Sequence, residues 1–349
     1  MKSEAIRVLV VDDSAVTRRW LSELIEAEDD LTVCGQAHHG VDAIEKVELL
    51  APDVVTLDLD MPVLDGLSAL KKIMVRQPTP VVVFSVHSTE NAPQAIEALE
   101  RGAVDCIAKP SALGGPGLEC ETKAILDGIR TASGAHPRPS STLSPRQDPP
   151  VSFSGSRGTR KVVAIGASTG GPQAVGSVIG GLPGNLDAAV LIVQHLPDVF
   201  VEPFARRLDS QVSLPVEIPS DGDLLESGRV YVAPKGHHLF LRSIEGRVRL
   251  RLDSSSRGRV LQPSVGELFL SLLEVDLEQV VSVLLTGMGD DGAAEMLQLK
   301  NRGACTLAQD ESSCVVYGMP RVAAELGAVD HVMKLSDLAK KITEKVGVS

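Results

Sequence analysis

The sequence predicts an α/β protein built from two doubly wound parallel sheets. Short apolar segments rich in valine and isoleucine alternate with amphipathic segments in both halves of the 349-residue chain, and a stretch rich in proline, serine and glycine separates the halves. Such alternation is typical of parallel sheets covered by helices, and this length favours about two domains. We predict an N-terminal domain at 1–130, a flexible tether at 131–159 and a C-terminal domain at 160–349.

Five strand–helix units are predicted in the N-terminal domain. Each predicted strand is a short apolar run, and each predicted helix carries apolar residues three or four positions apart. In sheets of this type the functional loops lie at the carboxyl ends of the strands. The predicted strands are 6–11, 31–37, 54–57, 81–84 and 105–108, and the predicted helices are 14–27, 40–50, 64–76, 91–101 and 118–130.

The C-terminal domain repeats this alternation and adds an antiparallel element. Buried strands are predicted at 162–165, 189–193, 230–233 and 280–285. Polar and apolar residues alternate through HLFLRSIEGRVRLRL at 238–252, which predicts a hairpin turning at Glu245 and Gly246.

Composition excludes several classes of function. The net charge of −12 argues against nucleic-acid binding, because contacts to phosphates require a basic surface. No apolar stretch is long enough to span a bilayer and no secretory signal is present, so we expect a cytoplasmic protein without membrane insertion. Scattered cysteines without paired spacing are expected to be reduced thiols that hold no metal. These cysteines are Cys34, Cys106, Cys120, Cys305 and Cys314.

Polar residues gather at the strand ends of the N-terminal domain. Asp12 and Asp13 follow the first predicted strand, Asp58 follows the third, Ser85 the fourth, and Lys109 the fifth. Crowded carboxylates repel one another unless a hard cation such as Mg²⁺ is bound between them. A carboxylate in such a site can attack a phosphoryl group while a lysine offsets the charge that develops.

This constellation resembles a response-regulator receiver domain over about 6–130. The resemblance is carried by the paired aspartates, the D-x-x-M-P motif at 58–62, the hydroxyl of Ser85, and Lys109 followed by proline. It implies a flavodoxin-like fold, phosphorylation of Asp58 by a histidine kinase, and a Mg²⁺ cofactor. The implied metal ligands are Asp13, Asp58 and the carbonyl of Asp60, with Asp12 in support.

One position departs from the receiver pattern. Receivers usually carry an aromatic residue three positions before the lysine, where this chain has Cys106. The chemistry of Asp58 does not require that aromatic side chain. We therefore expect Asp58 to be phosphorylated, with the conformational switch carried differently.

A candidate nucleophile opens the C-terminal domain in KVVAIGASTGGP at 161–172. Gly166 and Gly170 bracket Ser168 in a G-x-S-x-G spacing, which is typical of a sharp strand-to-helix turn that exposes a serine. Backbone amides at the start of the following helix favour a developing oxyanion. A nucleotide-binding turn is the alternative. The glycine spacing and the lack of a Walker lysine argue against it.

A serine nucleophile needs a base and an acid that orients it. His195 directly follows the next predicted strand, whereas His331 would reproduce the chain order of ordinary α/β-hydrolases. His237 and His238 are expected in a loop, lining substrate or exposed to solvent. Candidate acids are the adjacent Asp290 and Asp291 in LTGMGDDG, whose turn amides could also stabilise an oxyanion.

Several motifs together resemble the catalytic domain of the chemotaxis protein-glutamate methylesterases. They are GASTGGP, IVQHLP, QPSVGELF, LTGMGDDG and AQDESSCVVYGMPRVA, in that order. The resemblance implies a Rossmann-like domain with a triad of Ser168, His195 and Asp291, the amide of Met288 as an oxyanion donor, and Thr169 beside the nucleophile. It implies no cofactor for the esterase reaction.

The implied substrates are methylated glutamates of chemoreceptor cytoplasmic domains, with glutamine deamidation as a second reaction. Because the tether keeps the domains at a high effective concentration, we expect the receiver to inhibit the esterase until Asp58 is phosphorylated. The alternative is a phosphorylation-dependent binding module of a non-chemotaxis pathway with a different ester substrate.

Overall fold

The computed structural model describes residues 5–86, 92–110, 118–137, 158–256, 258–259 and 261–348. The chain forms two compact units, Met1–Thr142 and Leu143–Ser349. Helix α5 (Leu118–Ser133) continues three residues into the segment expected to be a tether, and Gly158 already pairs with Glu226 of the second unit. The structure also describes residues 134–137 and Thr159 of the predicted tether, whereas 138–157 lie outside the described residues.

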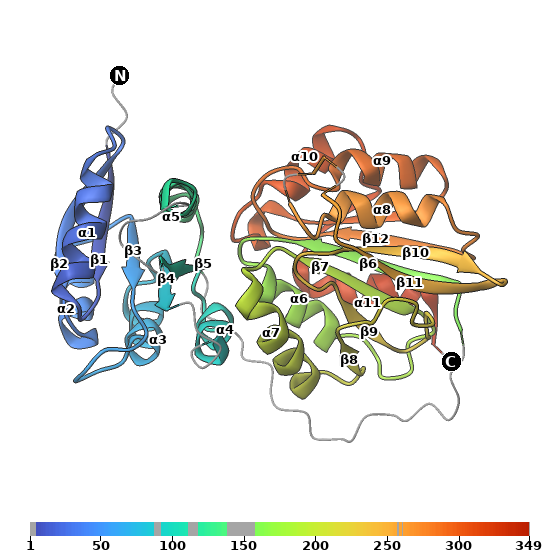
Figure 1. Ribbon diagram of the computed structural model, residues 1–349, viewed down its shortest axis with the longest axis horizontal. Coiled ribbons are helices and arrows are strands. Elements are labelled where there is room, and N and C mark those ends of the chain that lie inside the picture. Colours follow the sequence, from blue (N-terminus) through green and yellow to red (C-terminus); the bar gives the residue numbers. More distant parts are fainter. Residues whose placement is uncertain are drawn as a thin grey trace. The chain divides into compact units, whose positions relative to one another are not determined.

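The first unit is a five-stranded parallel sheet in the order β2-β1-β3-β4-β5 (Figure 1). This order confirms the predicted doubly wound sheet. The strands are β1 (Ile6–Val11), β2 (Leu31–Ala37), β3 (Val54–Leu57), β4 (Val81–Val86) and β5 (Asp105–Lys109). The other helices are α1 (Ala15–Glu26), α2 (Gly40–Leu50), α3 (Gly66–Arg76) and α4 (Ala92–Glu100).

Local sequence explains these boundaries. The first three strands have the predicted bounds; the apolar runs of β1 and β3 each end at an aspartate, and β2 ends before a pair of histidines. Strand β4 extends two residues beyond its predicted end and therefore includes Ser85. Side chains cap the helices: Ser14 accepts the Thr17 amide, and Asp65 accepts the Ser68 amide.

The second unit contains a seven-stranded sheet in the order β14-β13-β12-β6-β7-β9-β8, in which every pairing is parallel. Three strands were not predicted: β8 (Val216–Glu217), β13 (Cys305–Gln309) and β14 (His331–Met333). The others are β6 (Lys161–Ala167), β7 (Ala189–Gln194), β9 (Val230–Val232) and β12 (Gln279–Leu284). The predicted hairpin is confirmed as antiparallel β10 (His238–Ile244) and β11 (Arg247–Asp253).

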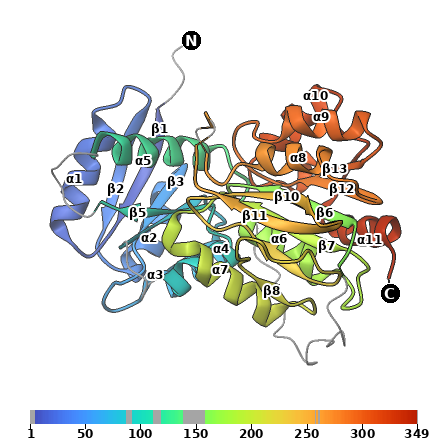
Figure 2. The same ribbon diagram turned by 45° about the vertical axis from the view of Figure 1, so that its right-hand side comes forward.

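Helices cover both faces of the second sheet (Figures 1 and 2). One face carries α8, α9 and α10 with the hairpin, and the other carries α6 and α11, with α7 packed against α6. These helices are α6 (Gly171–Gly180), α7 (Asp198–Gln211), α8 (Val265–Leu273), α9 (Ala293–Asn301), α10 (Met319–Glu325) and α11 (Leu335–Val346), with a short 3₁₀ turn at Glu311–Ser313.

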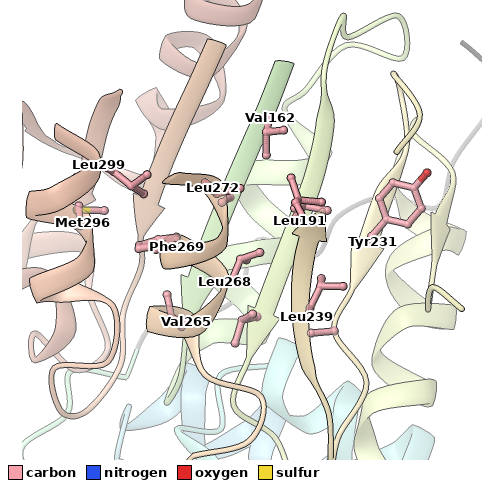
Figure 3. Close-up of a cluster of buried hydrophobic side chains, with 14 of the residues drawn as sticks. Val162, Leu191, Tyr231, Leu239, Val265, Leu268, Phe269, Leu272, Met296 and Leu299 are labelled. Carbon is pink, nitrogen blue, oxygen red and sulfur yellow. The ribbon is translucent and has the colours of Figure 1, made fainter. Parts of the chain in front are cut away.

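Helix α8 is anchored by one apolar stripe. Val265, Leu268, Phe269 and Leu272 recur at helical spacing and are at most 3% exposed, between the sheet and the hairpin (Figure 3). Burying each such side chain contributes about 1.5–3 kcal/mol. The stripe therefore fixes the N-terminus of α8, which reaches the candidate site described below.

The structure bears on two expectations drawn from composition, one about membrane-spanning segments and one about the cysteines. No helix in the described part of the chain is long and apolar enough to span a bilayer. Among the same residues no disulfide forms, and Cys34, Cys106, Cys305 and Cys314 carry thiols. The side chain of Cys120 lies outside the described residues.

Candidate active site and phosphorylation site

Ser168 stands at the carboxyl end of β6, in the tight turn that the sequence predicts. Gly170 caps helix α6 with a φ of +74°, a backbone conformation that favours glycine. A Cβ at that position would also lie 2.5 Å from Cβ of Val315. The turn therefore requires a glycine two residues after the serine, and it leaves Ser168 only half-buried.

His195 lies beside Ser168 on the neighbouring strand end. Strand β7 pairs with β6 so that Gln194 is opposite Ala167, and the His195 amide donates to the Ala167 carbonyl at 3.0 Å. Adjacent strands are about 4.8 Å apart. The Gln194 side chain joins the two ends, because its Nε2 donates to the carbonyls of Ser168 at 2.8 Å and His195 at 3.0 Å.

The segment after β12 lines the opposite side of Ser168. The Ser168 amide donates to the Thr286 carbonyl at 3.1 Å, and the Thr286 hydroxyl donates to the Thr169 carbonyl at 3.0 Å. A Cβ on Gly287 would lie 2.7 Å from Cβ of Ser168, so only glycine fits this approach. Met288 follows directly, with a side chain that is 55% exposed.

Asp291 binds His195 and is held firmly itself. Its Oδ2 lies 3.0 Å from His195 Nε2, and the two side chains are 10% and 12% exposed. Burial raises the pKa of Asp291, but the hydrogen bonds from His195, the Gly266 amide and the Ser264 hydroxyl outweigh it, so the pKa is lowered. The carboxylate is therefore ionised at neutral pH.

The other candidate acid and the other candidate histidines lie away from the contact between His195 and Asp291. Asp290 is exposed, unlike its neighbour Asp291. His331 begins β14 at the edge of the sheet, three strand positions from β6, which corresponds to about 14 Å. Such a distance excludes a hydrogen bond to Ser168. Two predictions cover His238: the hairpin at 238–252 is confirmed, because the residue begins β10, whereas the expectation of a loop position lining substrate or exposed to solvent was wrong, because the residue is completely buried. His237 is half-buried.

The first unit brings its acidic residues together as predicted. Lys109 Nζ lies 2.7 Å from Asp12 and 2.9 Å from Asp58, and all three side chains are largely buried. Burial raises the pKa of Asp58 to about 6, although the Lys109 ammonium acts in the opposite direction. Burial lowers the pKa of Lys109, but Asp12 and Asp58 outweigh that effect and the pKa is raised.

The donor set of this acidic site fits a hard divalent cation. Carboxylate oxygens of Asp12, Asp13 and Asp58 lie within 4.8 Å of one another. Carboxylate oxygens are ligands that Mg²⁺ prefers. Asp13 and Asp60 also line an adjoining pocket of about 280 Å³.

The two remaining receiver positions are buried in the sheet. Ser85 is 2% exposed and pairs with Ala108 in β5. Cys106 is also 2% exposed and pairs with Val83, and burial raises the pKa of its thiol. The side chain at the usual aromatic position is therefore small and packed inside.

Sequence reasoning missed three residues that build the hydrolase site: Gln194, Thr286 and Ser264. Ser264 could have been found, because S-x-x-E at 264–267 is a capping-box pattern that predicts a helix start. Gln194 and Thr286 carry no such signal. Their roles depend on which strands are neighbours in the sheet.

The fold and the two sites define a class of protein: a receiver-type α/β domain followed by an α/β domain with a serine-hydrolase arrangement. Family models match in the same order, with "Response regulator receiver domain" at residues 8–114 and "CheB methylesterase" at 163–342. The chain belongs to the CheB methylesterase family, and its domain order is that of a two-domain response regulator.

Individual relatives agree over almost the whole chain. A protein-glutamate methylesterase/protein-glutamine glutaminase of Symbiobacterium thermophilum is 43% identical, over 98% of this chain and 97% of its own. A relative of the same name from Geobacillus kaustophilus is 40% identical over 99% of both chains. The crystal structure of the Thermotoga maritima CheB methylesterase catalytic domain is 37% identical, with a TM-score of 0.51, and covers 53% of this chain and 97% of its own.

Proposed function

We propose that this chain removes methyl groups from glutamate side chains of chemoreceptors, and that phosphorylation of its receiver domain activates this hydrolysis. One observation carries the proposal. Ser168 and His195 occupy adjacent strand ends, and the same imidazole is hydrogen-bonded to the ionised, buried carboxylate of Asp291. Family membership and the curated relatives support glutamate methyl esters as substrates.

The first chemical step is acyl transfer to Ser168. Its Oγ attacks the γ-carbonyl carbon of the methyl ester while His195 accepts the hydroxyl proton. Since Nε2 of His195 faces Asp291, the nitrogen that accepts the proton is Nδ1. The tetrahedral intermediate collapses as the imidazolium protonates the departing methoxide, which leaves as methanol.

The second step restores the enzyme. Water loses a proton to His195 and attacks the acyl carbon, and Ser168 leaves with the proton that His195 returns. The products are a glutamate carboxylate on the substrate and the regenerated hydroxyl of Ser168. Throughout both steps Asp291 holds the imidazole in one tautomer and stabilises its charged form.

The negative charge on the carbonyl oxygen needs hydrogen-bond donors. We assign the backbone amide of Met288 as a donor, because Gly287 lies against Ser168 and Met288 is the next residue. Thr169 supports the turn through its carbonyl contact with Thr286. Removal of one oxyanion donor typically lowers kcat by roughly 10²–10³.

A glutamine side chain presents the same carbonyl geometry with ammonia as the leaving group. The relatives carry the name protein-glutamine glutaminase in addition to methylesterase. We therefore propose deamidation of receptor glutamines as a second reaction of the same triad, with no cofactor for either reaction.

Regulation is assigned to the acidic site of the receiver. Bound Mg²⁺ would neutralise the carboxylates and the incoming phosphoryl oxygens. Asp13 and Asp58, with the carbonyl of Asp60, would hold the ion; Asp12 would support it and Lys109 would pair with the phosphoryl group. The phosphodonor is a histidine kinase of a chemotaxis-type system, and the substrate places the reaction in the cytoplasm.

Methanol release from a methylated chemoreceptor cytoplasmic domain tests both assignments. We expect release to rise with a small phosphodonor plus Mg²⁺, to vanish in Ser168→Ala, and to lose its stimulation in Asp58→Asn. Folded protein that releases no methanol in any condition would contradict the esterase assignment. That result would favour a phosphorylation-dependent binding module or a different ester substrate.

A further inference from the structure

The carboxylate of Asp291 is bound at the N-terminus of helix α8. Its Oδ1 accepts hydrogen bonds from the Ser264 hydroxyl at 2.8 Å and the Gly266 amide at 3.0 Å. Its Oδ2 accepts from the Val265 amide at 2.7 Å and contacts Nε2 of His195 at 3.0 Å. Each oxygen thus has two partners, and the carboxylate cannot rotate without losing several of them.

Ser264 supplies the only side-chain hydroxyl among these partners. The residue is 1% exposed and is the N-cap of α8, where its oxygen also accepts the Glu267 amide at 3.4 Å. A serine hydroxyl has one proton to donate. Because the Glu267 amide is a donor, that proton is committed to Asp291, and the hydroxyl is oriented from both sides.

The backbone of Ser264 is fixed by the hairpin. Its amide donates to Nδ1 of the buried His238 at 3.2 Å, so the ring proton of His238 is on Nε2. Further along α8, the Leu241 amide donates to the Ser271 hydroxyl at 3.1 Å. Strand β10 therefore holds α8 at two points about two helical turns apart, and Leu239 and Leu268 pack between them (Figure 3).

We propose that Ser264, itself held in place by His238, is a positioning residue of the hydrolase site: its hydroxyl keeps the Asp291 carboxylate oriented toward Nε2 of His195. This inference rests on the proposed function for its kinetic consequences. Loss of the hydroxyl leaves more negative charge on the Asp291 carboxylate, and this charge favours the protonated imidazole. The base then becomes unavailable over a wider range of acidic pH.

The test compares Ser264→Ala with Ser264→Thr and Ser271→Ala in the full chain. Ser271 is a matched control: it is a buried serine on the same helix whose hydroxyl contacts β10 and the Leu268 carbonyl but does not touch Asp291. Ser271→Ala removes these two hydrogen bonds. Any change that this variant shows is therefore an effect of lower stability and not of a lost contact with Asp291. Threonine keeps the hydroxyl at the cap.

Two readouts are used. Imidazole ¹⁵N NMR follows protonation of His195 against pH without any substrate, and methanol release gives kcat, KM and the pH profile. We expect Ser264→Ala to move the midpoint of His195 protonation to higher pH than in the unaltered chain and to lower kcat roughly 10- to 100-fold, with KM changed little. In Ser264→Thr we expect the midpoint of His195 protonation and kcat to equal those of the unaltered chain. In Ser271→Ala we expect the midpoint to be unchanged.

A midpoint in Ser264→Ala that equals the unaltered value would overturn the proposal. An equal shift in Ser271→Ala would do the same, because the effect would then be one of stability. If the unaltered chain releases no methanol while the Ser264-specific shift is observed, the proposed function fails and the positioning role stands.

Discussion

Nε2 of His195 and Oδ2 of Asp291 lie 3.0 Å apart, although 96 positions separate the two residues in the chain. The contact joins the end of β7 to the turn before α9, across the ends of β6 and β12. Because Asp291 also accepts three hydrogen bonds at the start of α8, it acts purely as an acceptor. Nε2 of His195 therefore carries a proton, and Nδ1 is the ring nitrogen that can accept one from the proposed nucleophile Ser168.

The first prediction separates the two adjacent aspartates. Asp291→Asn keeps the size of the side chain but replaces one acceptor oxygen with a donor, so the tautomer of His195 is no longer enforced. We expect kcat for methanol release to fall by roughly 10⁴. Asp290→Asn, at an exposed position, should stay within a few-fold of the unaltered rate. The reverse order of the two rates would show that Asp290 orients the base.

The second prediction concerns the base. His195→Gln removes the proton acceptor next to Ser168, and we expect a loss of several orders of magnitude in kcat. His331→Gln changes an exposed residue on the edge strand β14 and should leave kcat and KM essentially unchanged. Steady-state methanol release measures both. Hydrolysis that survives in His195→Gln and disappears in His331→Gln would assign the triad to His331.

The sequence predicted strands better than it predicted contacts. The bounds of β1 and β3 follow from apolar runs that end at an aspartate, which is a local signal. Strand β14 is three residues long and largely exposed, so no apolar run marks it.

The same limit applies to the hydrolase site. The glycine-rich turn predicted Ser168, but only the family resemblance chose between Asp290 and Asp291. The choice is made in three dimensions by where the turn after β12 meets α8. His238 was placed in a loop for the same reason, since its burial depends on α8 packing against β10.

The third prediction uses two glycines that share a backbone conformation. Gly170 and Gly303 have φ values of +74° and +89°, but only Gly170 has a neighbour where a Cβ would be placed, at 2.5 Å in Val315. Gly303→Ala should cost about 1–2 kcal/mol of stability and leave the activity of the folded enzyme intact. Gly170→Ala adds a steric clash two residues from the nucleophile, so we expect kcat to fall at least tenfold as well.

Stability and activity are measured separately for these variants. Urea unfolding gives the free energy of unfolding, and methanol release at a temperature where both variants are folded gives kcat. An equal loss of kcat in Gly303→Ala would show that backbone strain, and not the contact with Val315, is responsible.

The fourth prediction follows from the raised pKa of Asp58, about 6 against an ordinary value of 3.8. The folded protein binds this proton more tightly than the unfolded chain does. The contribution of Asp58 to stability is therefore fully present below about pH 4 and is lost as pH rises through about 6. The difference corresponds to about 3 kcal/mol in the absence of a divalent cation.

Asp58→Asn removes this pH dependence, so its stability relative to the unaltered chain should rise by up to about 3 kcal/mol between pH 4 and pH 7 in EDTA. The single tryptophan, Trp20 on α1, reports unfolding of the receiver in urea.

Asp65→Asn is the control, because the pKa of Asp65 is shifted in the opposite direction from that of Asp58. Burial raises the pKa of Asp65, but hydrogen bonds from Ser68 outweigh it and the pKa is lowered, so Asp65 loses its contribution as pH falls. Parallel pH curves for Asp58→Asn and the unaltered chain would mean that Asp58 is ionised in the folded receiver at acidic pH, with Lys109 outweighing its burial.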